Sequence, residues 1–263
     1  MSVSPFHAQQ RLPVLKGLLA RQNTASKEQG LTLIECLVAV FVIGLTVTLI
    51  TPPLFIAAAT RAQNRRAEQA LQIAQGEVDR IRTMVARGNH TNADLPKEIP
   101  NGIALKDYGT PNGFVGSLIK TPSSACTGRY DDRAIDPTKA LKVDVDGDCV
   151  ADFFMQVFRT RGNTTQDQRT STPTVTQQRP SDFQLGVRVY SIVADGTAPG
   201  NAWGNLESPP QQASLQMTNG QGNQRRRPLA IIYTPFSWSD QNSTLCSYFQ
   251  NANGALPQGC PPP

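Results

Sequence analysis

The chain has 263 residues and a formal net charge of +5. The first 30 residues carry four basic side chains against one acidic side chain, a net of +3, which leaves only +2 for residues 31–263. So small a charge argues against nucleic-acid binding, and the length suits one membrane helix followed by one domain of ordinary size.

Residues 1–30 are polar and basic and show no periodic apolar pattern, which predicts a cytoplasmic leader that is not part of the folded protein. An almost uninterrupted apolar run follows, QGLTLIECLVAVFVIGLTVTLITPP, from Gln29 to Pro53. From Leu31 to Ile56 this run would measure about 39 Å as a helix, which is enough to cross a hydrocarbon core of about 30 Å with some tilt. We therefore expect a transmembrane helix over 31–56.

Glu35 is the one carboxylate in this run. A charge inside a bilayer costs on the order of a few kcal/mol, which suggests a partner for Glu35 in an assembly. One alternative is an ordinary membrane anchor whose Glu35 reaches the headgroups. Another is a secretory signal cut near Ala57-Ala58-Ala59, although its apolar region would exceed the usual roughly 7–15 residues.

The residues around Glu35 form a specific pattern. Gly30 is followed by Leu31-Thr32-Leu33-Ile34-Glu35, after a basic leader and before Gly44 and Pro52. This pattern resembles the cleavage and methylation signal of type IV pilins and pseudopilins. The long leader and the loop-rich region after the helix resemble those of minor pilins, including cyanobacterial ones.

The resemblance implies a maturation pathway and an assembly role. A prepilin peptidase would cut between Gly30 and Leu31, and Leu31 would become the N-methylated first residue. Glu35 would neutralise the terminal amine of a neighbouring subunit inside a filament, where an ion pair removes much of the cost of a charge in lipid. Pro52 matches the position at which the family's helix bends.

Beyond the membrane the helix is expected to continue over 57–86. Apolar residues recur on one face at spacings of three and four, while Glu77 and its charged neighbours fall mostly elsewhere. The apolar face consists of Leu71, Ala74, Val78, Ile81 and Val85. Gly88-Asn89 suits the end of the helix, because glycine accepts the left-handed conformation of a C-terminal cap.

Residues 87–263 are predicted to form a loop-rich β-sheet ectodomain. The candidate strands are Phe114–Ile119, Ala140–Val145, Phe153–Phe158, Phe183–Val193 and Pro228–Tyr233. The fourth alternates apolar and polar residues, which is typical of a half-buried strand, and the fifth indicates a more buried one. Segments 161–180 and 195–227 are predicted loops. The expected fold class is α+β, a long N-terminal transmembrane helix whose second half packs on an antiparallel sheet, as in pilins.

Four of the five cysteines lie in the predicted ectodomain and none has a zinc-like spacing. Disulfides in an oxidising compartment are the favoured interpretation, with reduced thiols as the alternative. Sequence-local closure favours Cys126 with Cys149 and Cys246 with Cys260, although three pairings are open.

The segment after the second candidate strand carries alternating carboxylates around Gly147. Asp144, Asp146, Asp148 and Asp152 occupy positions one, three, five and nine of a loop that resembles calcium loops. The sixth position is Cys149 and the twelfth is Met155, so the oxygen set is incomplete and binding would be weak. Calcium and a metal-free acidic turn held by a disulfide remain alternatives, and no other cofactor is expected.

Catalysis finds little support, because the only histidines are His7 in the leader and His90, which we expect at the surface. Arg225-Arg226-Arg227 could contact a polyanion, but solvated loop charge is the favoured interpretation.

The sequence therefore predicts a non-enzymatic minor pilin or pseudopilin. Its expected location is the inner membrane, with one transmembrane pass, an extracytoplasmic C-terminal domain and assembly into a filament. Its expected partners are other pilin subunits, the prepilin peptidase and the inner-membrane assembly platform. The alternative is a membrane-tethered module that binds calcium or a polyanion.

Overall fold

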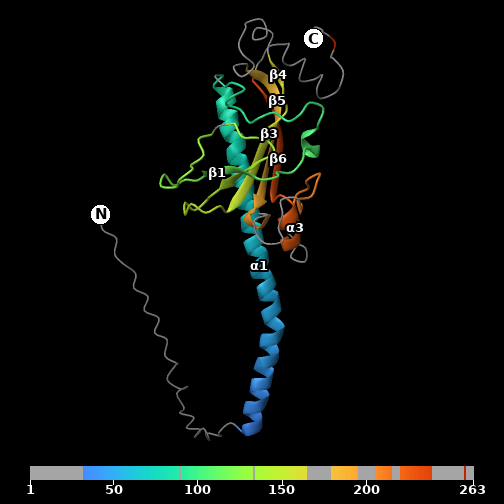
Figure 1. The fold of residues 1–263 in the computed structure, drawn as a ribbon. Helices are drawn as coiled ribbons and strands as arrows, with labels where there is room; N and C mark the ends of the chain where they lie inside the picture. Colours follow the sequence, from blue (N-terminus) through green and yellow to red (C-terminus); the bar gives the residue numbers. More distant parts are fainter. Residues whose placement is uncertain are drawn as a thin grey trace, which may run out of the picture. The chain divides into compact units, whose positions relative to one another are not determined.

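The computed structural model describes residues 32–88, 90–132, 134–164, 179–194, 205–214, 220–238 and 258. Its layout is α+β, with one long helix and a six-stranded sheet (Figure 1). The helices are α1 (Leu33–Ala86), η1 (Leu105–Asp107), η3 (Ile192–Ala194) and α3 (Gly220–Arg226). The strands are β1 (Phe114–Lys120), β2 (Ala140–Val143), β3 (Phe153–Arg159), β4 (Asn163–Thr164), β5 (Pro180–Ser191) and β6 (Ala230–Ser237).

The first half of α1 is apolar and exposed. Among the described residues, α1 is the one helix long and apolar enough to cross a membrane, and none of its most apolar window is buried. The hydroxyls of Thr46, Thr48 and Thr51 each donate to a carbonyl three or four residues earlier, at 2.6–2.8 Å. These bonds leave no hydroxyl hydrogen unpaired in this segment, which suits a helix surrounded by lipid.

The second half of α1 packs on one face of the sheet (Figure 1). The buried apolar residues of this half are Ala70, Ala74, Val78, Ile81 and Val85. The predicted packed face is therefore confirmed except at Leu71, which is 42% exposed, because the smaller Ala70 faces the sheet instead. The predicted end of the helix is confirmed at Gly88, which has φ +71° and donates its amide to the Val85 carbonyl at 3.0 Å.

The strand order is β1-β2-β3-β5-β4, and β6 pairs with the other edge of β5. All five predicted strands are present, with some ends displaced. The expectation of an antiparallel sheet is wrong at one edge, because β1 and β2 are parallel and the sheet is mixed. Alternation of side chains has the same period in both strand directions, so it could not reveal this pairing. The predicted loops also contain two short elements, β4 and α3.

The burial of β5 and β6 is the reverse of the prediction. In β5 every residue except Gln184 is buried, whereas β6 is largely half-buried or exposed. The face of β5 that points away from α1 is covered by two small apolar clusters, which contain Phe158 and Tyr190 respectively. β6 lies at an edge of the sheet and has one neighbouring strand among the described residues.

Arg159, at the end of β3, fixes the irregular segment that follows α1. Its guanidinium is 1% exposed and donates to the Pro96 carbonyl at 2.7 Å and to Asn92 Oδ1 at 2.8 Å. It also donates to the Thr160 carbonyl and to Glu98 Oε1, at 3.0 and 3.3 Å. A segment without a regular backbone ladder needs other partners for its polar groups, and this guanidinium binds one carbonyl and two side chains of the segment.

His90 is buried, so the expectation of a surface histidine is wrong. Its Nε2 lies 3.0 Å from the Pro180 carbonyl oxygen, and its ring meets the Trp238 ring edge-on at 5.4 Å. Burial lowers the pKa of His90, and the charges of Arg179 and Arg159 lower it further. His90 is therefore a neutral packing residue between the end of α1 and the start of β5.

Glu77 lies on the sheet side of α1 and not on its solvated side. It is 2% exposed, and its two carboxylate oxygens accept from Arg80 and from Lys120 Nζ, each at 2.6 Å. Burial alone would raise the pKa of Glu77, but the hydrogen bond from Arg80 and the charge of Lys120 outweigh it and lower the pKa below 4.5. Because Lys120 ends β1, the pair joins helix and sheet through residues far apart in the sequence.

Replacing Glu77 by glutamine should lower the free energy of unfolding at neutral pH by about 2–4 kcal/mol, because Lys120 loses its carboxylate and Arg80 keeps only the longer contact with Asp132, at 3.6 Å. The lowered pKa means that the Glu77 contribution is fully present above 4.5 and is lost as pH falls through the folded-state pKa. In urea unfolding, the difference between wild type and variant should therefore be largest at pH 7 and should shrink as the pH falls through the folded-state pKa.

Asp79→Asn is the matched control for Glu77. Asp79 pairs with Arg82 at 2.9 Å, but both side chains are more than 60% exposed. The control should change stability by less than about 1 kcal/mol. Equal effects of the two variants would contradict the assigned role of Glu77.

Candidate functional site

Glu35 lies in the first turn of α1 and forms a capping box with Thr32. Its Oε2 accepts from the Thr32 amide and the Thr32 hydroxyl, both at 3.2 Å, and its own amide donates to Thr32 Oγ1 at 3.3 Å. The sequence carries the usual signature of this motif, a threonine followed three residues later by glutamate. Gly30 and Leu31 lie outside the described residues.

Glu35 is also the only charged residue between positions 33 and 60, and its surroundings in α1 are exposed. In a bilayer such a carboxylate would need a cation or strong donors from outside its own helix. The capping box supplies two donors but no positive charge. The geometry thus leaves Glu35 able to pair with a cation of another molecule.

Pro52 and Pro53 lie inside α1 and do not end it. Neither has an amide hydrogen, so the carbonyls four residues earlier, at Thr48 and Leu49, receive no helical donor from them. The chain divides into two compact units at this point. The bend that the pilin resemblance implies at Pro52 stays a prediction.

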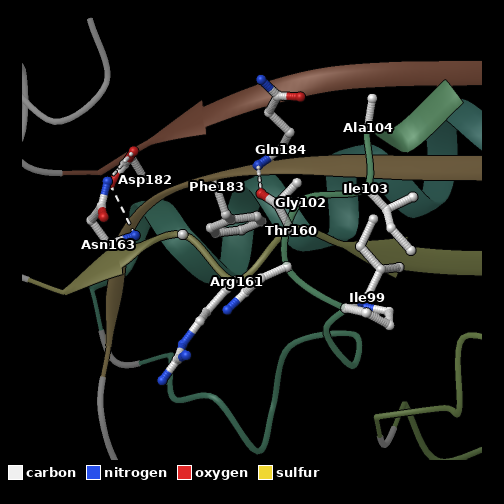
Figure 2. A pocket seen from close by; sticks show the side chains of 13 residues that line it. Ile99, Gly102, Ile103, Ala104, Thr160, Arg161, Asn163, Asp182, Phe183 and Gln184 are labelled. Atoms are coloured by element: carbon white, nitrogen blue, oxygen red, sulfur yellow. Dashed lines mark hydrogen bonds between the residues drawn. The ribbon is translucent and has the colours of Figure 1, made fainter. Parts of the chain in front are cut away.

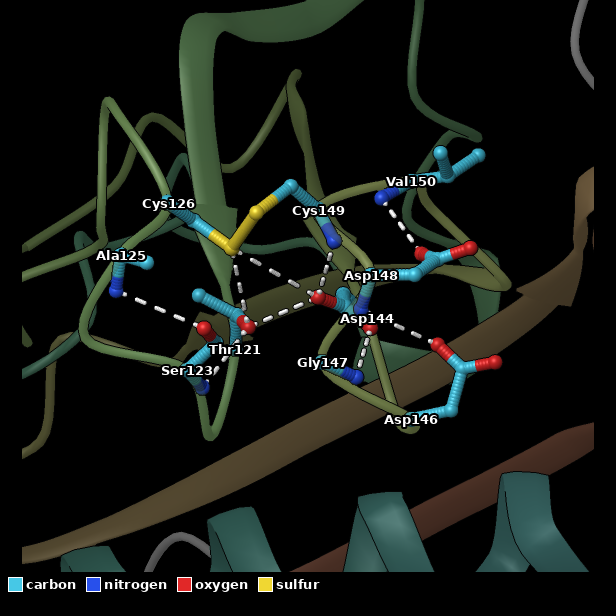
Figure 3. The surroundings of a disulfide bond; sticks show 10 residues. All are labelled: Thr121, Ser123, Ala125, Cys126, Asp144, Asp146, Gly147, Asp148, Cys149 and Val150. Atoms are coloured by element: carbon cyan, nitrogen blue, oxygen red, sulfur yellow. Dashed lines mark hydrogen bonds between the residues drawn. A yellow bond between two sulfur atoms is a disulfide. The ribbon is translucent and has the colours of Figure 1, made fainter.

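The acidic segment forms a turn between β2 and β3, held by the disulfide Cys126–Cys149 (Figure 3). This predicted pairing is confirmed, with the two Cα atoms 5.4 Å apart. Cys246 and Cys260 lie outside the described residues, so their pairing stays a prediction. Cys36 is free and exposed in α1.

Asp144 is the organising residue of the turn, and only 2% of it is exposed. Its carboxylate accepts from the Thr121 hydroxyl at 2.7 Å and from the amides of Gly147 and Cys149 at 2.7 and 2.9 Å. Burial alone would raise the pKa of Asp144, but these three hydrogen bonds lower it. Cys149 has φ +68°, and the disulfide and the bond to Asp144 hold it in that conformation.

Three of the four predicted metal ligands gather. Asp144, Asp146 and Asp152 each offer a carboxylate oxygen, and these oxygens lie within 4.8 Å of one another. The fourth, Asp148, is not in this group and accepts the Val150 amide at 2.7 Å. Asp146 accepts a backbone hydrogen bond that lowers its pKa, but desolvation and the charges of Asp148 and Asp152 outweigh it and raise the pKa.

The arrangement of the aspartates is compatible with calcium binding and also with a metal-free acidic turn held by the disulfide. Backbone amides and the Thr121 hydroxyl occupy oxygens of Asp144 that a metal would need, and Asp152 Oδ2 accepts the Val145 amide at 2.8 Å. Asp146 remains exposed, with its oxygens near two other carboxylates. Calcium binding stays a prediction.

Replacing both Cys126 and Cys149 by serine should destabilise the protein by about 3 kcal/mol, because the disulfide closes a loop with a sequence separation of 23. The loss should appear as a lower midpoint of thermal unfolding at neutral pH. Substitution is a cleaner test than a reductant, which would act on any other disulfide as well. Cys36→Ser is the matched control and should leave the midpoint unchanged; an unchanged midpoint in the double variant would contradict the assigned role.

A pocket of about 460 Å³ lies beside the loop 99–104 and the end of β3 (Figure 2). Its polar groups are largely paired with one another. The Asn163 side chain donates to Asp182 Oδ2 at 3.1 Å, and the backbone amide of Gln184 donates to Thr160 Oγ1 at 2.9 Å. Arg161 is exposed at its rim, 3.9 Å from Glu98. These groups do not converge on one point, so the pocket has no evident chemistry.

The basic run Arg225-Arg226-Arg227 lies at the end of α3. Arg227 forms a two-bond pair with Glu207, at 2.5 and 2.8 Å, and this hydrogen bonding raises the pKa of Arg227 and lowers that of Glu207. Arg226 donates to the Asn205 carbonyl at 3.2 Å. Two of the three arginines therefore serve the local fold, which leaves little free charge for a polyanion.

The described candidate residues thus form two separate groups. One is Glu35 at the start of the exposed apolar helix, and the other is the disulfide-held acidic turn. Comparison of the chain with family models, with curated proteins and with solved structures found no match.

Proposed function

We propose that the protein is a minor pilin or pseudopilin, a structural subunit of a type IV pilus or a related type II-like secretion filament. The observation that carries the proposal is Glu35, a lone carboxylate in the first turn of a helix whose apolar first half is exposed. That helix continues into a half that packs on a sheet. A plain membrane anchor needs no charge at this position.

In this proposal the leader 1–30 is removed by cleavage after Gly30, and Leu31 is N-methylated. The mature subunit crosses the inner membrane once and presents its sheet domain outside the cytoplasm. It then enters a filament through the assembly platform and packs against other pilin subunits. Glu35 pairs with the terminal amine of a neighbour, because that contact offers the cation that its own helix lacks.

The mass of the amino-terminal peptide tests the proposal. The protein is extracted from membranes of cells that contain a prepilin peptidase, and the expected first residue is N-methylated Leu31. Gly30→Leu, in which a large side chain blocks the cut, is the matched control and should keep Met1. A wild-type chain that starts at Thr60 or keeps Met1 would contradict the proposal.

The alternative is a membrane-tethered module whose acidic turn binds calcium. The observation that favours it is the cluster of Asp144, Asp146 and Asp152. This alternative predicts that millimolar calcium raises the midpoint of thermal unfolding and that Asp146→Asn abolishes the rise, because ligands stabilise the state they bind. Asp148→Asn is the matched control, since Asp148 lies outside the cluster. No rise in the wild type would leave the turn as a metal-free structural element.

A further inference from the structure

Two arginines that follow the apolar segment of α1 lack partners. Arg61 and Arg65 are exposed, and their side chains make no hydrogen bond or ion pair with any described residue. Arg80 and Arg82, farther along the same helix, pair with Glu77 and Asp79 at 2.6 and 2.9 Å. Guanidinium groups without a carboxylate partner are available to an anion, and their geometry suits phosphate.

Arg61 and Arg65 share the face of α1 that points away from the sheet. They lie about one turn apart. Arg61 precedes the buried Ala70 by nine residues, and Arg65 precedes the buried Ala74 by nine. Nine residues make about two and a half turns, which puts each arginine on the side of the helix opposite to the buried alanine. Arg66 differs from them, because it lies near the packed side and lines a small pocket with Asp146 and Asp152. Arg66 is also exposed, so what distinguishes Arg61 and Arg65 is that they lie opposite the sheet.

In a bilayer whose hydrocarbon core ends at Ile56, the two arginines would lie at the height of the lipid headgroups. Arg61 follows Ile56 by about 7–8 Å along the helix and Arg65 by about 13–14 Å. The headgroup region adds about 5–8 Å to each side of the hydrocarbon core. With that boundary Arg61 would fall beside the phosphates, and the long side chain of Arg65 would extend back toward them. Glu68 is exposed one turn farther from the membrane, and no ion pair joins it to Arg65.

We propose that Arg61 and Arg65 bind the phosphate groups of anionic phospholipids in the leaflet on the ectodomain side. The guanidinium fork suits phosphate oxygens, and the arginines continue directly from the lipid-facing segment. The inference rests on the membrane-spanning helix of the proposed function and goes beyond it. Binding at this height would hold the start of the ectodomain half of α1 at the membrane surface.

The test uses the full chain reconstituted in vesicles of equal parts phosphatidylcholine and phosphatidylglycerol. After gentle detergent extraction, native mass spectrometry counts the two lipids that stay bound. The wild type should retain phosphatidylglycerol above its bulk ratio, with roughly a fivefold preference from each arginine. The double variant Arg61→Gln/Arg65→Gln should fall to the bulk ratio. Arg82→Gln, on the same helix but far from the headgroups, should behave as the wild type.

Other results would overturn the inference. A wild type that inserts but keeps the lipids in their bulk ratio would remove the lipid site and leave the proposed function intact. A chain that alkaline carbonate strips from the vesicles would contradict both. Displacement of the lipid by inorganic phosphate, but not by chloride at equal ionic strength, would indicate a site for the free anion. A double variant that keeps the lipid ratio but fails to enter filaments would assign the arginines to a second copy of the chain.

Discussion

Glu35→Gln should reduce incorporation into filaments by at least roughly tenfold, because removing one partner of a buried ion pair costs a few kcal/mol. Membrane insertion should persist, since glutamine is cheaper to place in lipid than a carboxylate. Glutamine also keeps the capping function, as both residues suit this helix position. The measurement compares the amount of the variant protein in sheared filaments with the amount in the membrane fraction of the same cells.

Thr32→Val separates the charge of Glu35 from its role in the capping box. Valine removes the hydroxyl that donates to Glu35 Oε2 and accepts from the Glu35 amide, but it leaves the carboxylate in place. The first turn of α1 should fray slightly and incorporation should stay near the wild-type level. Equal losses in Thr32→Val and Glu35→Gln would show that the cap, and not the charge, is what assembly requires.

Arg188→Met should cost about 3–5 kcal/mol of unfolding free energy, because it leaves several buried acceptors without donors. Arg188 is fully buried in β5 and donates to the carbonyls of Leu105 and Tyr108, at 2.7 and 2.9 Å. It also donates to Tyr233 Oη at 2.9 Å, and its guanidinium lies 4.6 Å from the centre of the Phe158 ring. This side chain attaches the segment around η1 to the sheet.

Arg188→Lys and Arg161→Met complete that experiment. Lysine keeps the charge but cannot donate to all the acceptors that the guanidinium binds. The free energy of unfolding of Arg188→Lys should therefore lie between those of Arg188→Met and the wild type. Arg161 is 63% exposed, and its replacement should cost less than about 1 kcal/mol. Urea unfolding of the full chain in detergent, followed by circular dichroism, measures all three variants. A loss in Arg188→Met no larger than in Arg161→Met would contradict the assigned role.

Local patterns in the sequence predicted the elements that depend on nearby residues. The apolar run and the spacing of Ala74, Val78, Ile81 and Val85 predicted α1 almost to its end, and Gly88 ends the helix as expected. The five strands and the Cys126–Cys149 bond were also predicted, because period and short closure are local properties. Three of the four aspartates of the calcium-like pattern lie close together, and calcium binding itself stays a prediction.

Burial was predicted least well where the partner is remote in the sequence. Glu77 reads as a solvent-facing residue until Lys120, 43 positions later, covers it. Arg188 reads as the polar half of an alternating strand until η1 supplies its acceptors. His90 reads as a surface histidine until the start of β5 closes over it. In each case the polar group is buried because a distant element satisfies it.

The sequence by itself determined that the chain has a long apolar helix with one carboxylate near its start, followed by strands and a disulfide. These features follow from composition and from periods of two and 3.6 residues, which are local. The tertiary structure alone decided that β1 and β2 are parallel and that β5 is covered on both faces. It also decided which arginines of α1 have carboxylate partners. Those outcomes depend on contacts between residues distant in the chain, and the free energy of such contacts is not written in any one segment.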